Sequence, residues 1–551
     1  MKNTFLEIPI PVNEPVKEYK PGSSEKKELK KELSNLKNNE VDIPMYIGNR
    51  EVRTENKIRI SPPHDHSHTL GYYNQGDKSH VEMAIEAAMN AKEKWNDIGP
   101  VKRANIFLKA AELIAGPYRA KINAATMLGQ SKNIFQAEID AACELIDFLR
   151  FNPHYMSNIY KEQPLSPEGM KNSLQYRPLE GFVFALSPFN FTSIAGNLCS
   201  SVALMRNTVL WKASRTQIYS ADVIMKVFKE AGLPDGVINL VHTSGRTAGE
   251  VIFKHPDFGG IHFTGSTAVF QHFWREIGDN ISIYKSYPRI VGETGGKDFI
   301  IAHKSADPLA VSTAIIRGGF EFQGQKCSAP SRVYIPDNLW SKIKQNLIDE
   351  IPTIKMGNPE DFTNFINAVI DEKAFYNITS YIDFAKNSDK HELLIGGKYD
   401  KSKGYFIEPT IIVSSDPKSK LMCEEIFGPI VTIYIYDAEK YEETIDLVNE
   451  TSPYALTGAV FSNNKEAIDL ASKKLENAAG NFYINDKPTG AVVGQQPFGG
   501  SRASGTNDKA GSYLNLVRWV SPRTTKEVFE SPTDYLSLIH ISEPTRLLSS
   551  A

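Results

Sequence analysis

Short apolar runs alternate with amphipathic stretches through the middle of the chain. Continuous apolar runs of about four to eight residues are typical of buried strands, and apolar residues that recur every three to four positions are typical of helices. The alternation of the two predicts an α/β fold with a parallel sheet. The predicted strands are 182–186, 208–212, 237–242 and 260–264, and the predicted helices are 193–206 and 217–231.

Polar residues and glycines follow several of these predicted strands. Ser187, Lys212, Ser214, Gly265 and Ser266 all stand at or just after a strand end. Because open parallel sheets bind ligands at the carboxyl ends of their strands, these residues are candidates for a ligand site. The dinucleotide fingerprint GxGxxG is absent, and the single-glycine turn before a helix is also common where no ligand binds.

The same rhythm resumes after Lys297, with strands predicted at 299–302 and 332–335, which indicates a second α/β domain. A glycine-dense loop follows at 494–502 and is typical of a tight turn or of a segment that covers a ligand. Near the start, residues 23–39 place three leucines on one stripe between charged residues. We expect a surface helix packed on the body, with a partner-binding role as the alternative.

Length and charge narrow the function classes. The 551 residues predict two or more domains, and a net charge of −3 indicates neither a nucleic-acid surface nor an anionic-membrane anchor. Four scattered cysteines without a CxxC pair argue against disulfides and a structural zinc site, so we expect no metal. No apolar run is long enough for a membrane span, and the start resembles neither a secretory signal nor a transit peptide. The expected location is cytoplasmic, with the mitochondrial matrix as the alternative for a eukaryotic chain.

Cys327 is the cysteine whose setting favours reactivity. It lies in a glycine-containing loop beside Lys326, with no acidic residue within four positions, and a neighbouring cation favours the thiolate. Cys143 and Cys199 lie in apolar helical patterns, and Cys423 precedes two glutamates that oppose ionisation. A lone cysteine is more often a small buried apolar residue, so Cys327 needs supporting residues before a catalytic role is credible.

Three other stretches, together with the one that contains Cys327, supply that support. The order and spacing of these four stretches resemble those of the aldehyde dehydrogenase superfamily, and the resemblance runs from about residue 44 to 535. Residues 142–148, 184–187 and 480–500 resemble the delta-1-pyrroline-5-carboxylate dehydrogenase branch, whose members oxidise glutamate semialdehyde to glutamate in proline catabolism. The four stretches are 187–191 (SPFNF), 292–297 (GETGGK), 324–327 (GQKC) and 424–429 (EEIFGP).

The resemblance implies roles for three catalytic residues. Cys327 is the nucleophile that attacks the aldehyde as a thiolate. The Asn190 side chain and the Cys327 backbone amide form the site that stabilises the resulting oxyanion. Glu293 is the base for the water that hydrolyses the thioester; taken alone, its Gly-Glu-Thr-Gly-Gly setting also fits a solvated turn.

The resemblance also implies a nicotinamide cofactor. It assigns the adenosine ribose to Lys212 and Ser214, the pyrophosphate to Ser266, and the nicotinamide side to Glu425 and Phe427. Ser187 and Gly265 belong to the same predicted site. We expect NAD, although Arg215 stands where many relatives carry an acidic residue. Because arginine can pair with a 2′-phosphate, NADP stays open as the alternative.

For the substrate, the resemblance points to an anchoring loop near the nucleophile. Ala491 stands where relatives often have serine, so we expect one hydrogen bond fewer to the substrate carboxylate and weaker binding, with the same reaction. The predicted substrate residues are Ser328, Gly490, Ala491, Phe498, Phe191, Glu144 and Lys326.

The expected domains are a helical arm (1–40), an NAD-binding domain (41–155 and 177–296), a catalytic domain (297–490), and an oligomerisation flap (156–176 and 505–535) that makes a homodimer through 171–176 and 511–522. Residues 536–551 resemble translated adapter sequence, and we expect a disordered artefact there. Functional coupling to a separate proline dehydrogenase is a further expectation. The alternatives are another NAD(P)-dependent semialdehyde dehydrogenase and a non-catalytic binding protein of this fold.

Overall fold

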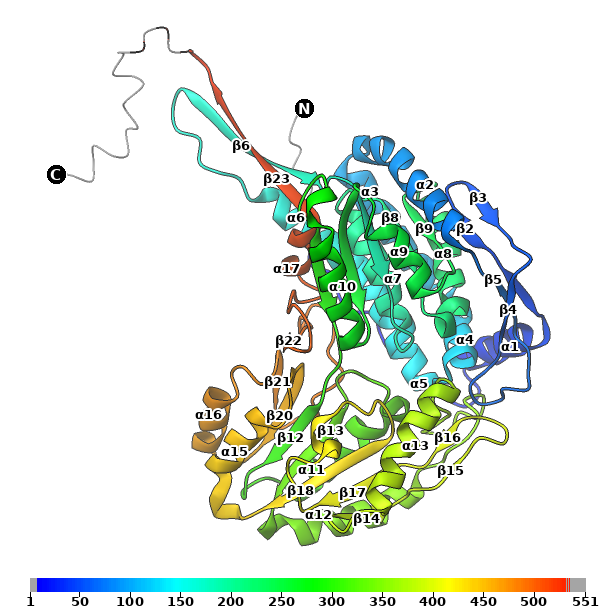
Figure 1. Cartoon of the computed structure of the whole chain (residues 1–551), viewed down its shortest axis with the longest axis vertical. Coiled ribbons are helices and arrows are strands. Elements are labelled where there is room, and N and C mark those ends of the chain that lie inside the picture. The colour runs from blue at the N-terminus through cyan, green and yellow to red at the C-terminus, as the bar shows by residue number, and fades with distance from the viewer. Residues whose placement is uncertain (1–6, 532, 534, 536–551) are drawn as a thin grey trace, which may run out of the picture.

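The computed structural model describes residues 7–531, 533 and 535. It contains two seven-stranded sheets, one in each lobe of the molecule seen in Figure 1. The predicted tail at 536–551 lies outside the described residues. None of the helices in the described part of the chain is long and apolar enough to cross a membrane.

The first sheet has the order β11-β10-β7-β8-β9-β2-β3. Its first five strands are parallel, and β2 pairs antiparallel with both β9 and β3 at one edge. The predicted strands and the helices between them are confirmed within a few residues at each end. The strands are β2 (Met45–Ile47), β3 (Arg50–Val52), β7 (Phe182–Leu186), β8 (Val209–Lys212), β9 (Ile238–Leu240), β10 (Phe258–Thr264) and β11 (Arg289–Glu293).

Helices cover both faces of this sheet because its strands are apolar on both sides. On β7, Val183 and Ala185 belong to one apolar cluster, whereas Phe182 and Phe184 belong to another, as the twofold period of a strand requires. The first face is covered by α3 (Pro100–Ala115), α4 (Arg119–Gln130), α6 (Glu144–Lys161), α7 (Thr192–Leu204) and α8 (Ile218–Ala231), and the second by α2 (Lys78–Asp97), α9 (Gly245–Ile252) and α10 (Thr267–Asp279).

The second sheet has the order β14-β17-β18-β13-β12-β20-β21, parallel except for the edge strand β14. One face is covered by α11 (Pro308–Phe320) and α12 (Asp337–Glu350), the other by α13 (Glu372–Lys386), α15 (Tyr441–Glu450) and α16 (Lys465–Lys474). Its strands are β12 (Asp298–Ala302), β13 (Pro330–Pro336), β14 (His391–Ile395), β17 (Thr410–Ser414), β18 (Ile430–Tyr436), β20 (Thr457–Phe461) and β21 (Asn481–Ile484).

A long two-stranded ribbon projects from the body (Figure 1). It consists of β6 (Met170–Pro178) and β23 (Val520–Val528), paired antiparallel over their full lengths. Of the segment 511–522 that we expect at the dimer interface, only residues 520–522 belong to this ribbon, because α17 (Tyr513–Leu516) and a 3-10 turn (Val517–Trp519) precede them. The residues that pair with β6 are charged and polar rather than apolar, so hydrophobic pattern alone does not reveal this strand.

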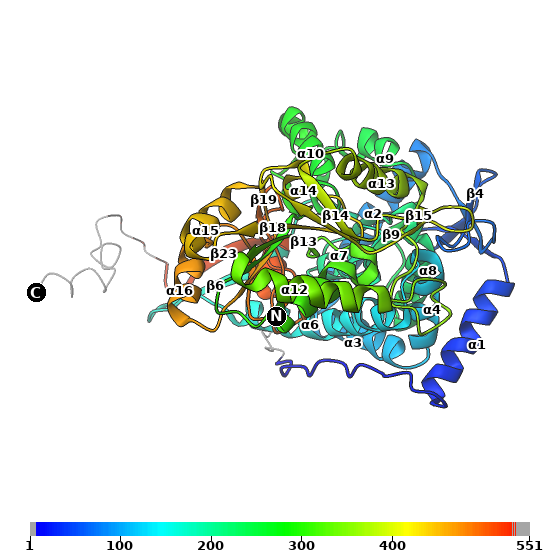
Figure 2. The same ribbon diagram turned by 90° about the horizontal axis from the view of Figure 1, so that it is seen from below.

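The chain before the first sheet forms an extended segment, which runs along α6, followed by α1 (Ser24–Asn38) (Figure 2). The helix buries Leu29, Leu33 and Leu36 and packs on α4, as its leucine stripe predicts. Smaller elements complete the fold: β1 (Val41–Ile43), β4 (Lys57–Ile60), β5 (Gly71–Asn74), α5 (Ile134–Ala137), a π-helix (Glu138–Cys143), β15 (Tyr399–Asp400), β16 (Phe406–Ile407), α14 (Lys420–Cys423), β19 (Tyr454–Ala455) and β22 (Ser501–Arg502).

Candidate active site

The loop that carries Cys327 is held in an unusual backbone conformation. After α11, Phe322 and Gln323 adopt left-handed φ values of 48° and 55°, and Gly324 follows at 66°. A Cβ on Gly324 would lie 2.3 Å from the carbonyl oxygen of Gly428, so only glycine fits there. The Gln323 side chain donates to backbone carbonyl oxygens of two other segments, at 3.1 and 2.7 Å. These buried hydrogen bonds hold the strained turn and fix the position of Cys327.

Three segments bring the predicted catalytic residues together. Glu293 ends β11 in the first sheet, and Cys327 lies in the loop of the second lobe. Both line one cavity of about 240 Å³. Asn190, in the turn between β7 and α7, donates its side-chain amide to the carbonyl oxygen of Gln325 at 3.0 Å. An amide carries two donor hydrogens, so this bond leaves Asn190 a second one.

Burial controls the protonation of both Glu293 and Cys327. Burial raises the pKa of Glu293 to about 8, opposed by Lys509 and supported by Asp508. The pKa of the Cys327 thiol lies well above its usual range, first because of burial and then because of negative charges that include Glu293. Each residue keeps some accessible surface only because it lines the cavity. The negative charge of Glu293 thus opposes ionisation of the Cys327 thiol.

The expectation that Lys326 favours the Cys327 thiolate is wrong. The Lys326 ammonium lies 3.4 Å from a carboxylate oxygen of Glu321 and 3.6 Å from one of Asp140. Burial lowers the pKa of Lys326, but these two carboxylates outweigh it and raise the pKa overall. Because two carboxylates neutralise the ammonium of Lys326, it contributes little to stabilising the thiolate of Cys327. Sequence adjacency misled the interpretation because it cannot say which way a side chain points.

Lys212 and Ser266 have the free polar atoms that a dinucleotide site needs. Burial lowers the pKa of Lys212 to about 8, and among the described residues its ammonium pairs with no carboxylate. Its one hydrogen bond there goes to the carbonyl oxygen of Ala213 at 3.4 Å. Ser266 is the N-cap of α10, yet its hydroxyl makes no capping bond, and Gly265 precedes it in the turn. A buried cation and an uncapped helix start fit an anionic, hydroxyl-bearing ligand.

Glu425 and Phe427 reach the site from the second lobe. Glu425 accepts a hydrogen bond from the backbone amide of Gly296 at 2.8 Å, and burial raises its pKa to about 7. A Cβ on Gly295 would lie 2.3 Å from the Glu425 carboxylate, so the glycine pair makes room for it. Phe427 packs edge to face on Phe189 of the first lobe, with 5.7 Å between ring centres.

Two other predicted cofactor residues and Arg215 already have partners within the protein. Ser187 accepts from the Trp211 indole at 3.1 Å and donates to Gln217 at 3.3 Å. Ser214 lies 3.4 Å from the Thr216 hydroxyl. Arg215 forms an ion pair with Asp371 at 3.1 Å while remaining 68% exposed. The Arg215 guanidinium is therefore partly neutralised.

All the predicted substrate residues line the cavity that contains Cys327. Its loop side carries a hydrogen bond of 2.7 Å between the Ser328 and Thr489 hydroxyls, and its helix side carries Glu144, whose pKa is raised to about 8 by burial and by Asp140. The set is Ser328, Gly490, Ala491, Phe498, Phe191, Glu144 and Lys326.

Sequence reasoning missed a further part of the cavity wall. Asn13, Glu14 and Val16 of the extended N-terminal segment line it, and so does Asp147 of α6. Nothing in the pattern of the first 20 residues signals this role, because an extended segment buries polar contacts without a hydrophobic period. Asp140 and Cys143 also line the cavity, from a π-helix that is invisible to periodicity analysis.

The comparison with known proteins agrees with this geometry. The model of the aldehyde dehydrogenase family matches residues 51–520. The chain belongs to the aldehyde dehydrogenase family. It is similar to the mitochondrial delta-1-pyrroline-5-carboxylate dehydrogenase of Dictyostelium discoideum, with 52% identity over 96% of this chain and 95% of that protein.

Solved structures of this family resemble the chain over nearly its full length. The delta-pyrroline-5-carboxylate dehydrogenase from Mycobacterium tuberculosis bound with NAD has a TM-score of 0.94 and 48% identity, covering 98% of this chain and all of that one. Proline utilization A from Bdellovibrio bacteriovorus has a TM-score of 0.89 and 28% identity, and the match covers 95% of this chain but 54% of that one. Family membership and the α/β aldehyde dehydrogenase fold are thereby confirmed.

Proposed function

We propose that this protein is a delta-1-pyrroline-5-carboxylate dehydrogenase, which oxidises L-glutamate γ-semialdehyde to L-glutamate with NAD. One observation carries the proposal: Cys327 and Glu293 share one cavity with the predicted substrate loop, in a chain that matches such dehydrogenases from end to end. The relative with bound NAD supports the choice of cofactor.

The first half of the reaction builds a covalent adduct on Cys327. Glu293 takes the proton of the thiol, and the sulfur attacks the aldehyde carbon, whose oxygen becomes an alkoxide. The free amide hydrogen of Asn190 and the backbone amide of Cys327 donate to this oxygen. A bound NAD would supply the acceptor for the hydride of the adduct carbon. The alkoxide electrons then form the carbonyl of a thioester on Cys327.

The second half releases the product. Glu293 first releases the thiol proton to solvent, and its carboxylate then accepts a proton from water as the water attacks the thioester carbonyl and the carbon–sulfur bond breaks. Glutamate leaves as the carboxylate, and the sulfur recovers a proton. The same carboxyl thus serves first the thiol and then the water, which its place in the cavity allows.

Lys212, Ser214, Ser266, Glu425 and Phe427 are the residues that would hold the cofactor. Lys212 and Ser266 offer free donors beside the first sheet, and Glu425 offers an acceptor from the second lobe. Ser187 and Gly265 would shape the same region. To bind the cofactor, Lys212 would give up only the long hydrogen bond of 3.4 Å to the carbonyl oxygen of Ala213.

We further propose a homodimer joined through the β6–β23 ribbon, with functional coupling to a separate proline dehydrogenase. Proline utilization A is a much longer chain that contains a region of this fold, which supports the coupling. The similar protein from Dictyostelium discoideum is named as mitochondrial. A cytoplasmic location therefore stays a prediction, with the matrix as its alternative.

The decisive experiment measures reduced nicotinamide by absorbance with glutamate semialdehyde and NAD. The wild-type protein should turn over, and Cys327→Ala should lower kcat at least about 1,000-fold, because no other group can form the thioester. Cys423→Ala, which changes a cysteine of α14 outside the cavity, is the matched control and should keep activity. Turnover of Cys327→Ala at the wild-type rate, or a strong preference for another semialdehyde, would contradict the proposal.

The pH profile should report Glu293. A base acts only when unprotonated, and its pKa is raised to about 8, so kcat/KM should rise about tenfold per pH unit below 8 and level off above it. Glu293→Gln should abolish this rise and nearly all activity. Glu392→Gln, at an exposed carboxylate of β14, should leave the profile unchanged. A profile that is flat from pH 6 to 9 in the wild type would refute the assignment.

Cofactor choice should depend on the partner of Arg215. Asp371→Asn removes the ion pair but keeps a side-chain oxygen to cap α13. Because an exposed pair contributes at most about 1 kcal/mol, the ratio of kcat/KM for NADP to that for NAD should rise up to about fivefold. The wild type should prefer NAD, and a wild-type preference for NADP would overturn the cofactor choice.

Ala491→Ser should restore one hydrogen bond to the substrate carboxylate. A hydrogen bond to a charged group contributes about 1.5 kcal/mol or more, so KM for glutamate semialdehyde should fall about tenfold while kcat changes little. The measurement is steady-state kinetics on both proteins. An unchanged KM would show that this position does not face the carboxylate.

A further inference from the structure

The extended N-terminal segment, residues 7–20, forms part of the wall of the substrate cavity. We call it the strap. Asn13, Glu14 and Val16 line the same cavity as Cys327, although they lie more than 300 positions away in sequence. The strap passes along α6 and α3 before it turns into α1 (Figure 2). It therefore closes the side of the cavity formed by α6 and the π-helix.

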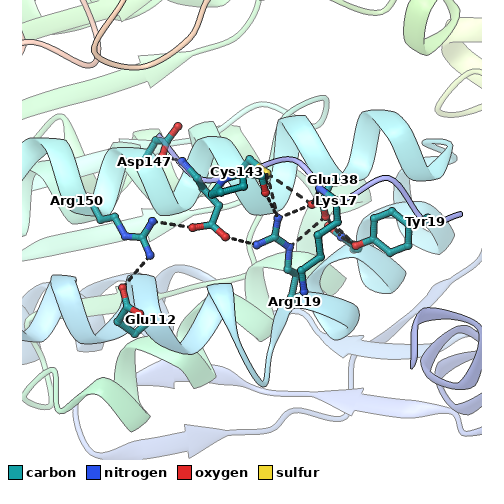
Figure 3. A network of polar contacts seen from close by, with 11 residues as sticks. Lys17, Tyr19, Glu112, Arg119, Glu138, Cys143, Asp147 and Arg150 are labelled. Atoms are coloured by element: carbon teal, nitrogen blue, oxygen red, sulfur yellow. Dashed lines mark hydrogen bonds and ion pairs between the residues drawn. The ribbon is translucent and has the colours of Figure 1, made fainter. Parts of the chain in front are cut away.

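A network of buried charges holds the strap in place (Figure 3), and Ile8 and Tyr19 add apolar contacts to the core. Glu14 forms ion pairs with Arg119 of α4 and, at 2.7 Å, with Arg150 of α6. Glu138 accepts hydrogen bonds from the Lys17 backbone amide and the Tyr19 hydroxyl, both at 2.8 Å.

Arg119 links the two carboxylates, Glu14 of the strap and Glu138 of the π-helix. Arg119 also pairs with Glu138 and donates to the carbonyl oxygen of Pro15 at 2.9 Å. Tyr19 is only 7% exposed, and the Glu138 side chain is fully buried. If the strap left, Glu138 would lose two of its donors inside the protein and Arg119 would lose the carboxylate of Glu14, and removing partners from buried charges is destabilising. The strap is therefore a fixed wall in the folded protein.

Asn13 connects α6 to the predicted substrate loop. Its side-chain amide donates to a carboxylate oxygen of Asp147 and to the carbonyl oxygen of Val493, both at 2.8 Å. Its side-chain oxygen accepts from Gln495 at 2.9 Å. The neighbouring Glu14 amide donates to the other oxygen of Asp147 at 2.8 Å. One asparagine thus fixes the distance between the helix side and the loop side of the cavity.

Two apolar side chains of the strap, Ile10 and Val12, do not share this role. Ile10 and Val12 are 75% and 82% exposed, so they contribute little to the cavity or to the core. Among the described residues, no arginine or lysine donates a hydrogen bond to Asp147, and burial raises its pKa to about 6. Its carboxylate depends on the two strap donors, which makes the contact between Asn13 and Asp147 a positioning contact.

We propose that the strap limits the length of the aldehydes that the site accepts and that Asn13 is its positioning residue. By joining Asp147 to the loop at residues 489–498, Asn13 holds the cavity at the size of a short amino acid semialdehyde and excludes longer ones. This inference rests on the proposed function. It adds a specificity determinant from a segment far from the catalytic residues in sequence.

The test compares Asn13→Ala with wild type on two substrates, glutamate semialdehyde and the homologue with one further methylene. Loss of Asn13 removes two donated bonds and one accepted bond, so KM for glutamate semialdehyde should rise about tenfold at nearly unchanged kcat. The wild-type preference for the shorter substrate, as a ratio of kcat/KM values, should fall about tenfold. Val12→Ala, one position earlier on the strap, is the matched control and should change neither value.

A second variant guards against misfolding. Gln495→Ala removes only the bond from the loop to Asn13 and should raise KM about twofold at an unchanged thermal midpoint. If Asn13→Ala does not fold, Gln495→Ala and its substrate ratio decide the matter. The inference is overturned if KM and the substrate ratio of the folded variants equal those of wild type, or if kcat and the thermal midpoint fall together with no change in the ratio. If the wild type itself fails on glutamate semialdehyde, the proposed function fails first.

Discussion

The site depends on the electrostatic coupling between a buried thiol and a buried carboxyl that line the same cavity. Cys327 and Glu293 each have a raised pKa, and each negative charge would raise the other further. The proposed role of Cys327 as nucleophile therefore requires a base that removes the thiol proton, and the charge state of Glu293 influences the ionisation of Cys327.

Such a pair requires two sheets to meet at one place. Glu293 ends a strand of the first sheet, whereas Cys327 follows a helix of the second lobe, and glycines allow the connecting backbone to come close. A Cβ on Gly296 would lie 2.1 Å from the Cys327 carbonyl oxygen, and a Cβ on Gly295 would meet Glu425. The glycines just after Glu293 therefore allow close packing of the two lobes as well as a turn of the chain, because any side chain at these positions would push the lobes apart.

The sequence predicts the parts of this structure that follow local rules. Apolar runs identify the four central strands β7, β8, β9 and β10 of the first sheet, and the leucine stripe of α1 predicts that this helix packs on the body. Relations between distant segments are beyond such rules. The polar strand β23 carries no hydrophobic signal, and the ammonium of Lys326 turns away from Cys327 toward Glu321 and Asp140.

The strap shows most clearly that contacts between distant segments cannot be predicted from local sequence. Its contacts are made by charged residues, and sequence patterns predict that charged residues are exposed to solvent. A buried network of charges is a poor source of net stability, since desolvation offsets most of the attraction. Its advantage is geometric: Glu14 fits only between two guanidinium groups at fixed positions, and Asn13 is then aligned with both Asp147 and Val493. An apolar strap would bind as firmly but could slide along its groove. Hydrogen bonds and ion pairs are directional, so they fix the position of the strap along α6. A fixed position of the strap is needed if the cavity is to have a defined length.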